Sequence, residues 1–95
     1  MQIGRAAGKL LMELFFTYIL VSEKSGRYYI GHTKDLKERL VYHNTGKVKS
    51  TRNKGSWKVA YFEKFDSKLQ ANQRELEIKK KKSRKYIEYL IYKRE

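Results

Sequence analysis

Neither cysteine nor proline occurs among the 95 residues of the chain. Without cysteine there can be no disulfide and no thiolate metal site, and nothing indicates an oxidising compartment. Long apolar runs are missing as well, because Glu13 interrupts the stretch from Leu10 to Val21, which is too short for a membrane span of about 20 residues. The first eleven residues lack the features of a signal peptide. We therefore expect a bacterial cytoplasmic protein with no membrane association.

Negative charge is also scarce, and the net charge is +13. Residues 1–45 hold seven Lys/Arg and four Asp/Glu, or +3, whereas residues 46–95 hold sixteen and six, or +10. A basic half of this kind is typical of proteins that bind nucleic acid, since neutralised phosphates release counterions. Charge alone does not separate binding from cutting. It favours a polyanionic partner and a place near the nucleoid.

The chain is long enough for one core and one domain. We expect residues 1–11 to form a loose extension and residues 12–95 to form the domain. Apolar and β-branched patterns predict strands over 14–22, 27–32 and 57–65. Asp35, Ser67 and Ser83 are placed to cap three helices, and Gly46 suits the left-handed position that ends the first. The predicted fold class is α+β, with the order ββαβαα and a three-stranded, mostly antiparallel sheet flanked by helices.

Two tyrosines lie on the predicted hairpin, Tyr18 in Phe16-Thr17-Tyr18 and Tyr29 in Tyr29-Ile30-Gly31. A two-residue turn at Lys24-Ser25 would place Tyr18 opposite Gly31 and both phenols on one face, whereas a three-residue turn would separate them. Gly31 has no side chain and leaves space for a ligand. The alternative interpretation is that both tyrosines only pack.

Polar residues also lie on the apolar faces of two predicted helices. At about 100° per residue, Arg39 and His43 fall within the arc of Leu36 and Leu40, and Glu75 falls between Ala71 and Ile78. The guanidinium suits a phosphate, and a carboxylate facing inward needs a cation. Arg39, a lysine or a divalent metal could supply it. The alternatives are an arginine at the core edge, a helix-end histidine and a structural ion pair.

Two basic stretches are candidates for contact with a nucleic-acid backbone. The run from Lys79 to Lys85 holds six Lys/Arg in seven residues, although consecutive lysines on a helix point in all directions. Residues 47–56 are polar and basic and are predicted to be a mobile loop. The candidate nucleic-acid-binding residues are Lys47, Lys49, Arg52, Lys54, Lys79, Lys82, Arg84 and Lys85. Phosphate loops, paired Asp clusters, nucleophile elbows and zinc spacings are absent from the sequence.

These motifs, in this order, resemble the GIY-YIG nuclease family. The similarity covers about Phe15 to Ile91 and is strongest to small stand-alone bacterial proteins akin to the nuclease domain of the nucleotide excision-repair incision subunit. The segments that carry it are the triplet ending in Tyr18, Tyr29-Ile30-Gly31, the Asp-Leu-x-x-Arg-Leu-x-x-His-Asn-x-Gly stretch from Asp35, the Trp-x-x-x-Tyr strand from Trp57 and Ala71 to Lys79.

The resemblance implies a site formed by Tyr18, Tyr29, Arg39, His43 and Glu75, with His32 in a position often basic. It implies that Glu75 is the protein ligand of a Mg²⁺ or Mn²⁺ ion that polarises the scissile phosphate. Arg39 would stabilise the charge on that phosphate. Tyr18 would be the general base, with His43 or His32 as competing candidates, and Tyr29 would orient the phosphate or water.

We therefore predict a metal-dependent endonuclease that hydrolyses DNA, selects structure more than sequence, and acts in DNA repair or recombination. Its DNA would be branched, damaged or single-stranded, RNA is not excluded as a partner, and the default expectation is a monomer. The alternative is a basic module that binds nucleic acid on a nuclease fold without cutting it.

Overall fold

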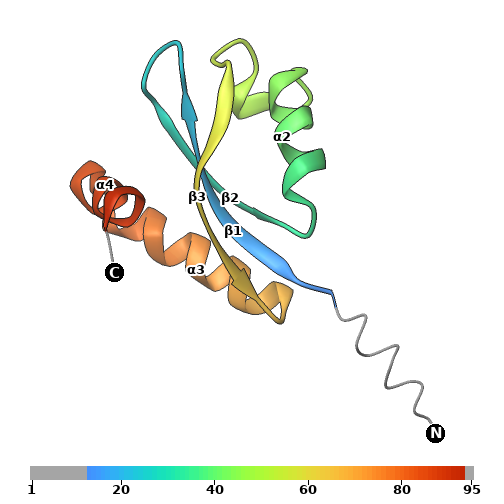
Figure 1. Cartoon of the computed structure of the whole chain (residues 1–95), viewed down its shortest axis with the longest axis vertical. Helices are drawn as coiled ribbons and strands as arrows, with labels where there is room; N and C mark the ends of the chain where they lie inside the picture. Colours follow the sequence, from blue (N-terminus) through green and yellow to red (C-terminus); the bar gives the residue numbers. More distant parts are fainter. Residues whose placement is uncertain (1–12, 94–95) are drawn as a thin grey trace, which may run out of the picture.

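The computed structural model describes residues 13–93. Its elements are β1 (Phe15–Ser22), β2 (Tyr28–Thr33), α2 (Leu36–Asn44), the short 3₁₀ helix η1 (Lys49–Thr51), β3 (Trp57–Phe65), α3 (Lys68–Lys81) and α4 (Arg84–Tyr92). This order confirms the predicted ββαβαα arrangement and α+β class (Figure 1). The expected extension over residues 1–11 lies outside the described residues. No helix between residues 13 and 93 combines the length and apolarity required to cross a bilayer.

The sheet has the order β2-β1-β3, and β1 pairs antiparallel with both neighbours. Tyr18 lies opposite Gly31, and Leu20 lies opposite Tyr29. This is the register predicted from the two-residue turn. The Ser22 hydroxyl fixes that turn by accepting the backbone N–H groups of Lys24 and Ser25. Both phenols therefore project from one face, and the alternative register is excluded.

Helices cover both faces of the sheet, α2 on one side and α3 with α4 on the other (Figure 1). Under α2, Leu36 and Leu40 pack against a cluster of Tyr18, Leu20 and Trp57. On the opposite face, the buried core residues are Ile19, Ile78 and Leu90. Apolar burial on both sides of β1 explains why this strand is apolar along most of its length.

The predicted helix caps are all present. Asp35, Ser67 and Ser83 each accept a backbone N–H three residues further on, and Gly46 has a φ of 79° after α2. The segment 47–56 contains a feature that the sequence did not predict. Here η1 buries Thr51, which is 1% exposed, below α2.

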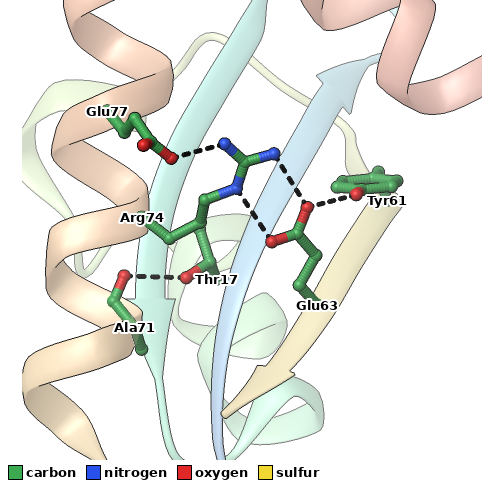
Figure 2. Close-up of polar contacts among 6 residues, drawn as sticks. All are labelled: Thr17, Tyr61, Glu63, Ala71, Arg74 and Glu77. Atoms are coloured by element: carbon green, nitrogen blue, oxygen red, sulfur yellow. Dashed lines mark hydrogen bonds and ion pairs between the residues drawn. The ribbon is translucent and has the colours of Figure 1, made fainter.

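An ion-pair network joins α3 to β3 on the face opposite α2 (Figure 2). The Arg74 guanidinium donates to both oxygens of Glu63, at 2.9 and 3.1 Å, and to Glu77 Oε1 at 2.6 Å. Tyr61 donates its hydroxyl proton to Glu63 as well. Burial alone would raise the pKa of Glu63, but the bonds from Arg74 and Tyr61 outweigh it and lower that pKa. The network is satisfied within itself, so it serves to hold the helix in place.

A second contact fixes α3 along its axis. The buried Thr17 hydroxyl donates to the Ala71 carbonyl oxygen at 2.7 Å (Figure 2). Because Thr17 is on the central strand, this bond and the Arg74 network set both the rotation and the height of α3. They therefore determine where Glu75, which follows Arg74, meets the sheet.

Candidate active site

Tyr18 is 1% exposed, and its ring reaches across the sheet face to the edge strand. A Cβ atom on Gly31 would lie 2.6 Å from Tyr18 Oη and 3.1 Å from Tyr29 Cε2. The space beside Gly31 was predicted to be open to a ligand, but the Tyr18 hydroxyl fills it, because the Tyr18 ring lies across the glycine. The Tyr18 and Tyr29 ring centroids are 6.3 Å apart, and Tyr29 lies 4.7 Å from the His43 ring.

Tyr18 is the first member of a buried hydrogen-bonded chain. Its hydroxyl is 3.0 Å from His43 Nε2, and His43 Nδ1 is 2.8 Å from Thr51 Oγ1. The Thr51 hydroxyl also lies 3.3 Å from the Val48 carbonyl oxygen, to which it can donate. We assign the proton of His43 to Nδ1 from this network, since Thr51 then accepts it. Nε2 is left as an acceptor for the Tyr18 proton.

The electrostatics keep both partners of the Tyr18–His43 bond neutral. Burial, with a smaller contribution from the Arg39 charge, lowers the pKa of His43 to about 4. Burial also raises the pKa of Tyr18 to about 12, against the opposing effect of Arg39. At neutral pH the proton therefore resides on Tyr18, and an uncharged imidazole is ready to accept it.

The lowered pKa of His43 predicts a component of acid sensitivity in stability. The pKa is about 4 in the folded state and about 6.5 when unfolded, so the unfolded state takes the proton first as pH falls. This component is fully present above pH ~6.5 and is lost progressively toward pH ~4, by up to about 3 kcal/mol. Chemical denaturation across this pH range would measure it. A His43→Gln variant should lack this component, and equal slopes in both proteins would contradict the assignment.

Arg39 lies beside this hydrogen-bonded chain of side chains, and one of its buried nitrogens has no hydrogen-bond partner in residues 13–93. Of the buried side-chain nitrogens and oxygens in residues 13–93, Arg39 Nε is the one without a hydrogen-bond partner. Such groups are rare in folded proteins, because each carries a desolvation cost. Arg39 lines a pocket of about 350 Å³ together with His32, Lys34 and Lys68. A phosphate oxygen in this pocket would satisfy the guanidinium.

Glu75 faces inward from α3, as predicted, with 12% of its side chain exposed. Its carboxylate accepts from two cationic or potentially cationic groups, His32 Nδ1 at 2.5 Å and Lys79 Nζ at 2.5 Å. Of the open alternatives for its cation, the structure thus selects a lysine rather than Arg39. His32 contacts Glu75 and not Tyr18, so it is a poorer candidate for the general base than His43.

The candidate site has two parts, which lie on opposite faces of the sheet and meet at the edge strand β2. Tyr18, Tyr29 and His43 belong to the α2 side, whereas His32 and Glu75 belong to the α3 side. Arg39 and His32 line the same pocket. Burial is the largest cause that raises the pKa of Tyr18, and the negative charge of Glu75 is a smaller one. All six residues predicted for the site therefore gather around β2 near Gly31.

The donor set fits a single hard divalent cation. Residues 13–93 contain no cluster of three His, Asp or Glu side chains that could hold a metal ion. Glu75 is the carboxylate that contacts His32, and Glu13 lines the Arg39 pocket. Mg²⁺ is commonly held by one or two carboxylates, with water and substrate phosphate as its other ligands. Glu75 could hold such an ion beside the Arg39 pocket.

The predicted nucleic-acid contacts fall into two groups. Lys79, Lys82 and Arg84 line one groove at the junction of α3 and α4, and Lys85 is exposed outside it. The others, Lys47, Lys49, Arg52 and Lys54, lie around η1. There Arg52 donates to the Gly46 carbonyl and Lys54 to the Ser50 carbonyl. These bonds hold the second group of basic residues in the loop that follows the C-terminus of α2.

Sequence reasoning missed four residues of this region. Thr51 lies in a basic stretch whose composition gave no sign of a buried hydroxyl. Lys34 and Lys68 line the Arg39 pocket, and Arg27 lines the groove. Lys34 and Arg27 flank the β2 strand, so their closeness in sequence to the predicted site residues of β2 is the signal that could have identified them.

Thr51 should act as a positioning residue for His43. The isosteric Thr51→Val change removes the acceptor of the His43 Nδ1–H, which would cost about 1–3 kcal/mol of stability and free the ring to turn. We expect the cleavage rate to fall about tenfold or more at unchanged substrate affinity. Thr51→Ser keeps the hydroxyl and should restore most of the rate. Full activity in the valine variant would rule this role out.

Comparison with known proteins shows the family to which this chain belongs. The family model described as the GIY-YIG catalytic domain matches residues 14–87. The chain therefore belongs to the GIY-YIG family of nuclease domains. Membership implies a hydrolase that acts on nucleic acid, and it confirms the resemblance found in the sequence.

Its relatives are small bacterial proteins. A UPF0213 protein of Streptococcus pneumoniae serotype 4 is 41% identical over 75 residues, which cover 77% of this chain and 76% of the relative. A UPF0213 protein of Clostridium perfringens is 42% identical over 66 residues, covering 68% and 70%. The solution NMR structure of a UPF0213 protein from Bacillus halodurans is 34% identical, with a TM-score of 0.50 and 82% coverage of both chains. These matches confirm the fold and the small stand-alone type.

Proposed function

We propose that this protein is a metal-dependent endonuclease that hydrolyses DNA phosphodiester bonds at the β2 edge. The observation that carries the proposal is the buried Arg39 Nε without a partner, in a pocket next to the Tyr18–His43 pair. A module that only binds nucleic acid has no need of a half-buried arginine with an unpartnered Nε beside a neutral proton acceptor. The inward-facing carboxylate of Glu75 also supports the nuclease over the binding module.

Arg39 would bind the scissile phosphate and stabilise the charge that develops on it. Glu75 would hold Mg²⁺ or Mn²⁺, which when bound would polarise the same phosphate. His32 and Lys79 would orient the carboxylate, since each contacts one of its two oxygens. Tyr29, whose ring lies beside those of Tyr18 and His43, would orient the phosphate or the attacking water.

Tyr18 and His43 would move the proton of the attacking water. Tyr18 Oη takes that proton while its own proton passes to His43 Nε2, so the relay leaves a neutral phenol and an imidazolium. No free phenolate has to form in this relay, although the phenol has a pKa of about 12, and the final proton acceptor is an imidazole whose pKa burial lowers to about 4. Thr51 fixes the imidazole in the tautomer that accepts.

The form of the substrate is part of the proposal. Residues 13–93 offer few elements that could read a base sequence, so we propose structure-selective cutting of branched, damaged or single-stranded DNA. Its place would be at the nucleoid in the cytoplasm, in repair or recombination. The net charge of +13 supports binding to such a polyanion.

Cleavage assays test this proposal directly. The purified chain would be incubated with supercoiled plasmid and with branched and single-stranded DNA, in Mg²⁺, in Mn²⁺ and in EDTA. We expect cutting that requires a divalent ion and disappears in Arg39→Ala at saturating substrate. Salt-dependent binding without cleavage under every condition would instead favour the binding module.

A further inference from the structure

A groove of about 390 Å³ lies between the open edge of β2 and the junction of α3 with α4. Its walls carry four cations, and its floor is apolar. The cations are Arg27, Lys79, Lys82 and Arg84; the floor is formed by Tyr28, Ile30, Ile78 and Ile87. Lys79, Lys82 and Arg84 were predicted from the sequence as backbone contacts, but neither the proposed mechanism nor the family match gives the groove as a whole a role.

Two of the four cations have no carboxylate to neutralise them. Within residues 13–93, Lys79 pairs with Glu75 and Arg84 pairs with Glu88 at 3.2 Å, whereas Arg27 and Lys82 form no ion pair. Both side chains are exposed at the rim. The rim therefore offers positive charge to an anion that enters the groove.

The floor offers a flat apolar surface with a cation over it. The Arg84 guanidinium lies 4.6 Å from the centre of the Tyr28 ring, and its Nη2 donates to the Gly26 carbonyl at 3.1 Å. This bond and the Glu88 pair hold the guanidinium in one place. Aromatic rings and guanidinium planes are the surfaces on which nucleic-acid bases stack.

The groove is continuous with the candidate active site. Lys79 lines the groove and also bonds to the Glu75 carboxylate at 2.5 Å. A ligand in the groove would therefore lie one side chain away from the place where Glu75 would hold the metal. The groove has an apolar floor and a cationic rim, and it continues into the candidate active site. These three properties match a nucleotide better than an acidic peptide, because the peptide has no flat base to bury.

We infer that this groove binds one unpaired nucleotide of the cleaved strand, next to the scissile phosphate. The inference rests on the proposed nuclease function. The base lies on the isoleucines and against the Arg84 guanidinium that covers the Tyr28 ring, and its flanking phosphates contact Arg27 and Lys82. Because a base in a duplex stays stacked on its neighbours, the groove selects strands that are single or frayed beside the cut.

The test measures binding without cleavage. A fluorescent single-stranded oligonucleotide of roughly 12 nucleotides is titrated in EDTA, with fluorescence anisotropy as the readout. The variant Arg27→Gln/Lys82→Gln is compared with Lys37→Gln/Lys64→Gln, which removes the same charge from exposed sites outside the groove. We expect the groove variant to bind at least about tenfold more weakly and the control less than about threefold. Equal losses in both variants would overturn the inference.

A second measurement tests the base contact. An abasic residue is moved along the oligonucleotide, and wild-type protein should lose about fivefold or more in affinity at one position only. A flat profile would mean that the groove attracts phosphate charge alone, and would overturn the nucleotide site. Competition by oligoglutamate at equal charge concentration would overturn it as well.

The two proposals fail separately. Because binding is measured in EDTA, a groove effect without any cleavage under Mg²⁺ or Mn²⁺ would leave the nucleotide site and remove the nuclease function. Metal-dependent cleavage with an unchanged KM in the groove variant would leave the nuclease and remove the site. If both proposals hold, the groove variant should raise KM for single-stranded DNA with kcat unchanged.

Discussion

Glu75→Gln is expected to abolish metal-dependent cleavage, with a loss of at least about 10³-fold in rate. The amide keeps the shape of the side chain and can still hydrogen-bond to its neighbours, but it has no charge with which to hold a divalent ion. The carboxylate is 12% exposed and lies beside His32, whereas Glu13, which also lines the Arg39 pocket, is exposed and pairs with Lys34 at 3.7 Å. Plasmid cleavage at increasing Mg²⁺ and Mn²⁺ would measure the loss.

The control for this change is Glu38→Gln, which removes the same charge from an exposed position on α2. It should cut DNA at the wild-type rate. Glu75→Gln should remain folded, since removal of the carboxylate breaks its pairs with His32 and Lys79 but leaves the Arg74 network in place. Thermal unfolding would check this. Undiminished cleavage by folded Glu75→Gln would refute the metal-ligand assignment.

Gly31→Ala is expected to destroy activity although it removes no reactive group. The new Cβ would lie 2.6 Å from Tyr18 Oη and 2.8 Å from Tyr18 Cζ, closer than real Cβ atoms approach other heavy atoms. Tyr18 is 1% exposed and its ring is enclosed, so it cannot swing away. We expect the bond to His43 to break, cleavage to fall about 100-fold or more, and stability to drop by about 1–3 kcal/mol.

A double-mutant cycle distinguishes this clash from a general effect of alanine in a strand. Tyr18→Phe removes the hydroxyl that meets the new Cβ, so Gly31→Ala should cost less stability in that background. Urea denaturation of the four proteins gives the coupling. Neither protein with Tyr18→Phe should cut DNA. Additive losses of stability, or a fully active Gly31→Ala protein, would contradict the geometry described for Tyr18.

Much of the fold follows from local signals in the sequence. Capping residues at 35, 67 and 83 begin the three helices where predicted, because a side-chain oxygen there satisfies a free N–H of the first turn. The short turn before Gly26 sets the hairpin register, and the register determines which side chains share a face. The inward positions of His43 and Glu75 follow from helical periodicity for the same local reason.

The partners of these side chains were less predictable. Periodicity turns Glu75 toward the core, but it does not say that His32 and Lys79 bond to it in place of Arg39. Nor does it show that Thr51, eight residues after His43, folds back through η1 to bond to the imidazole. Each of these contacts depends on how a helix or loop docks on the sheet.

By itself, the sequence determined the strands and helices, the inward faces of α2 and α3, and the family to which the chain belongs, whereas it left two hairpin registers open and the structure chose between them. These depend on residues close in the chain, or on motifs read one at a time. Only the tertiary structure decided which groups meet: the Tyr18–His43–Thr51 chain, the unpartnered Arg39 Nε, and the groove that joins Arg27 to Arg84. The reason is physical, since such contacts require segments 8 to 57 residues apart to pack together, and that packing is fixed by the core as a whole.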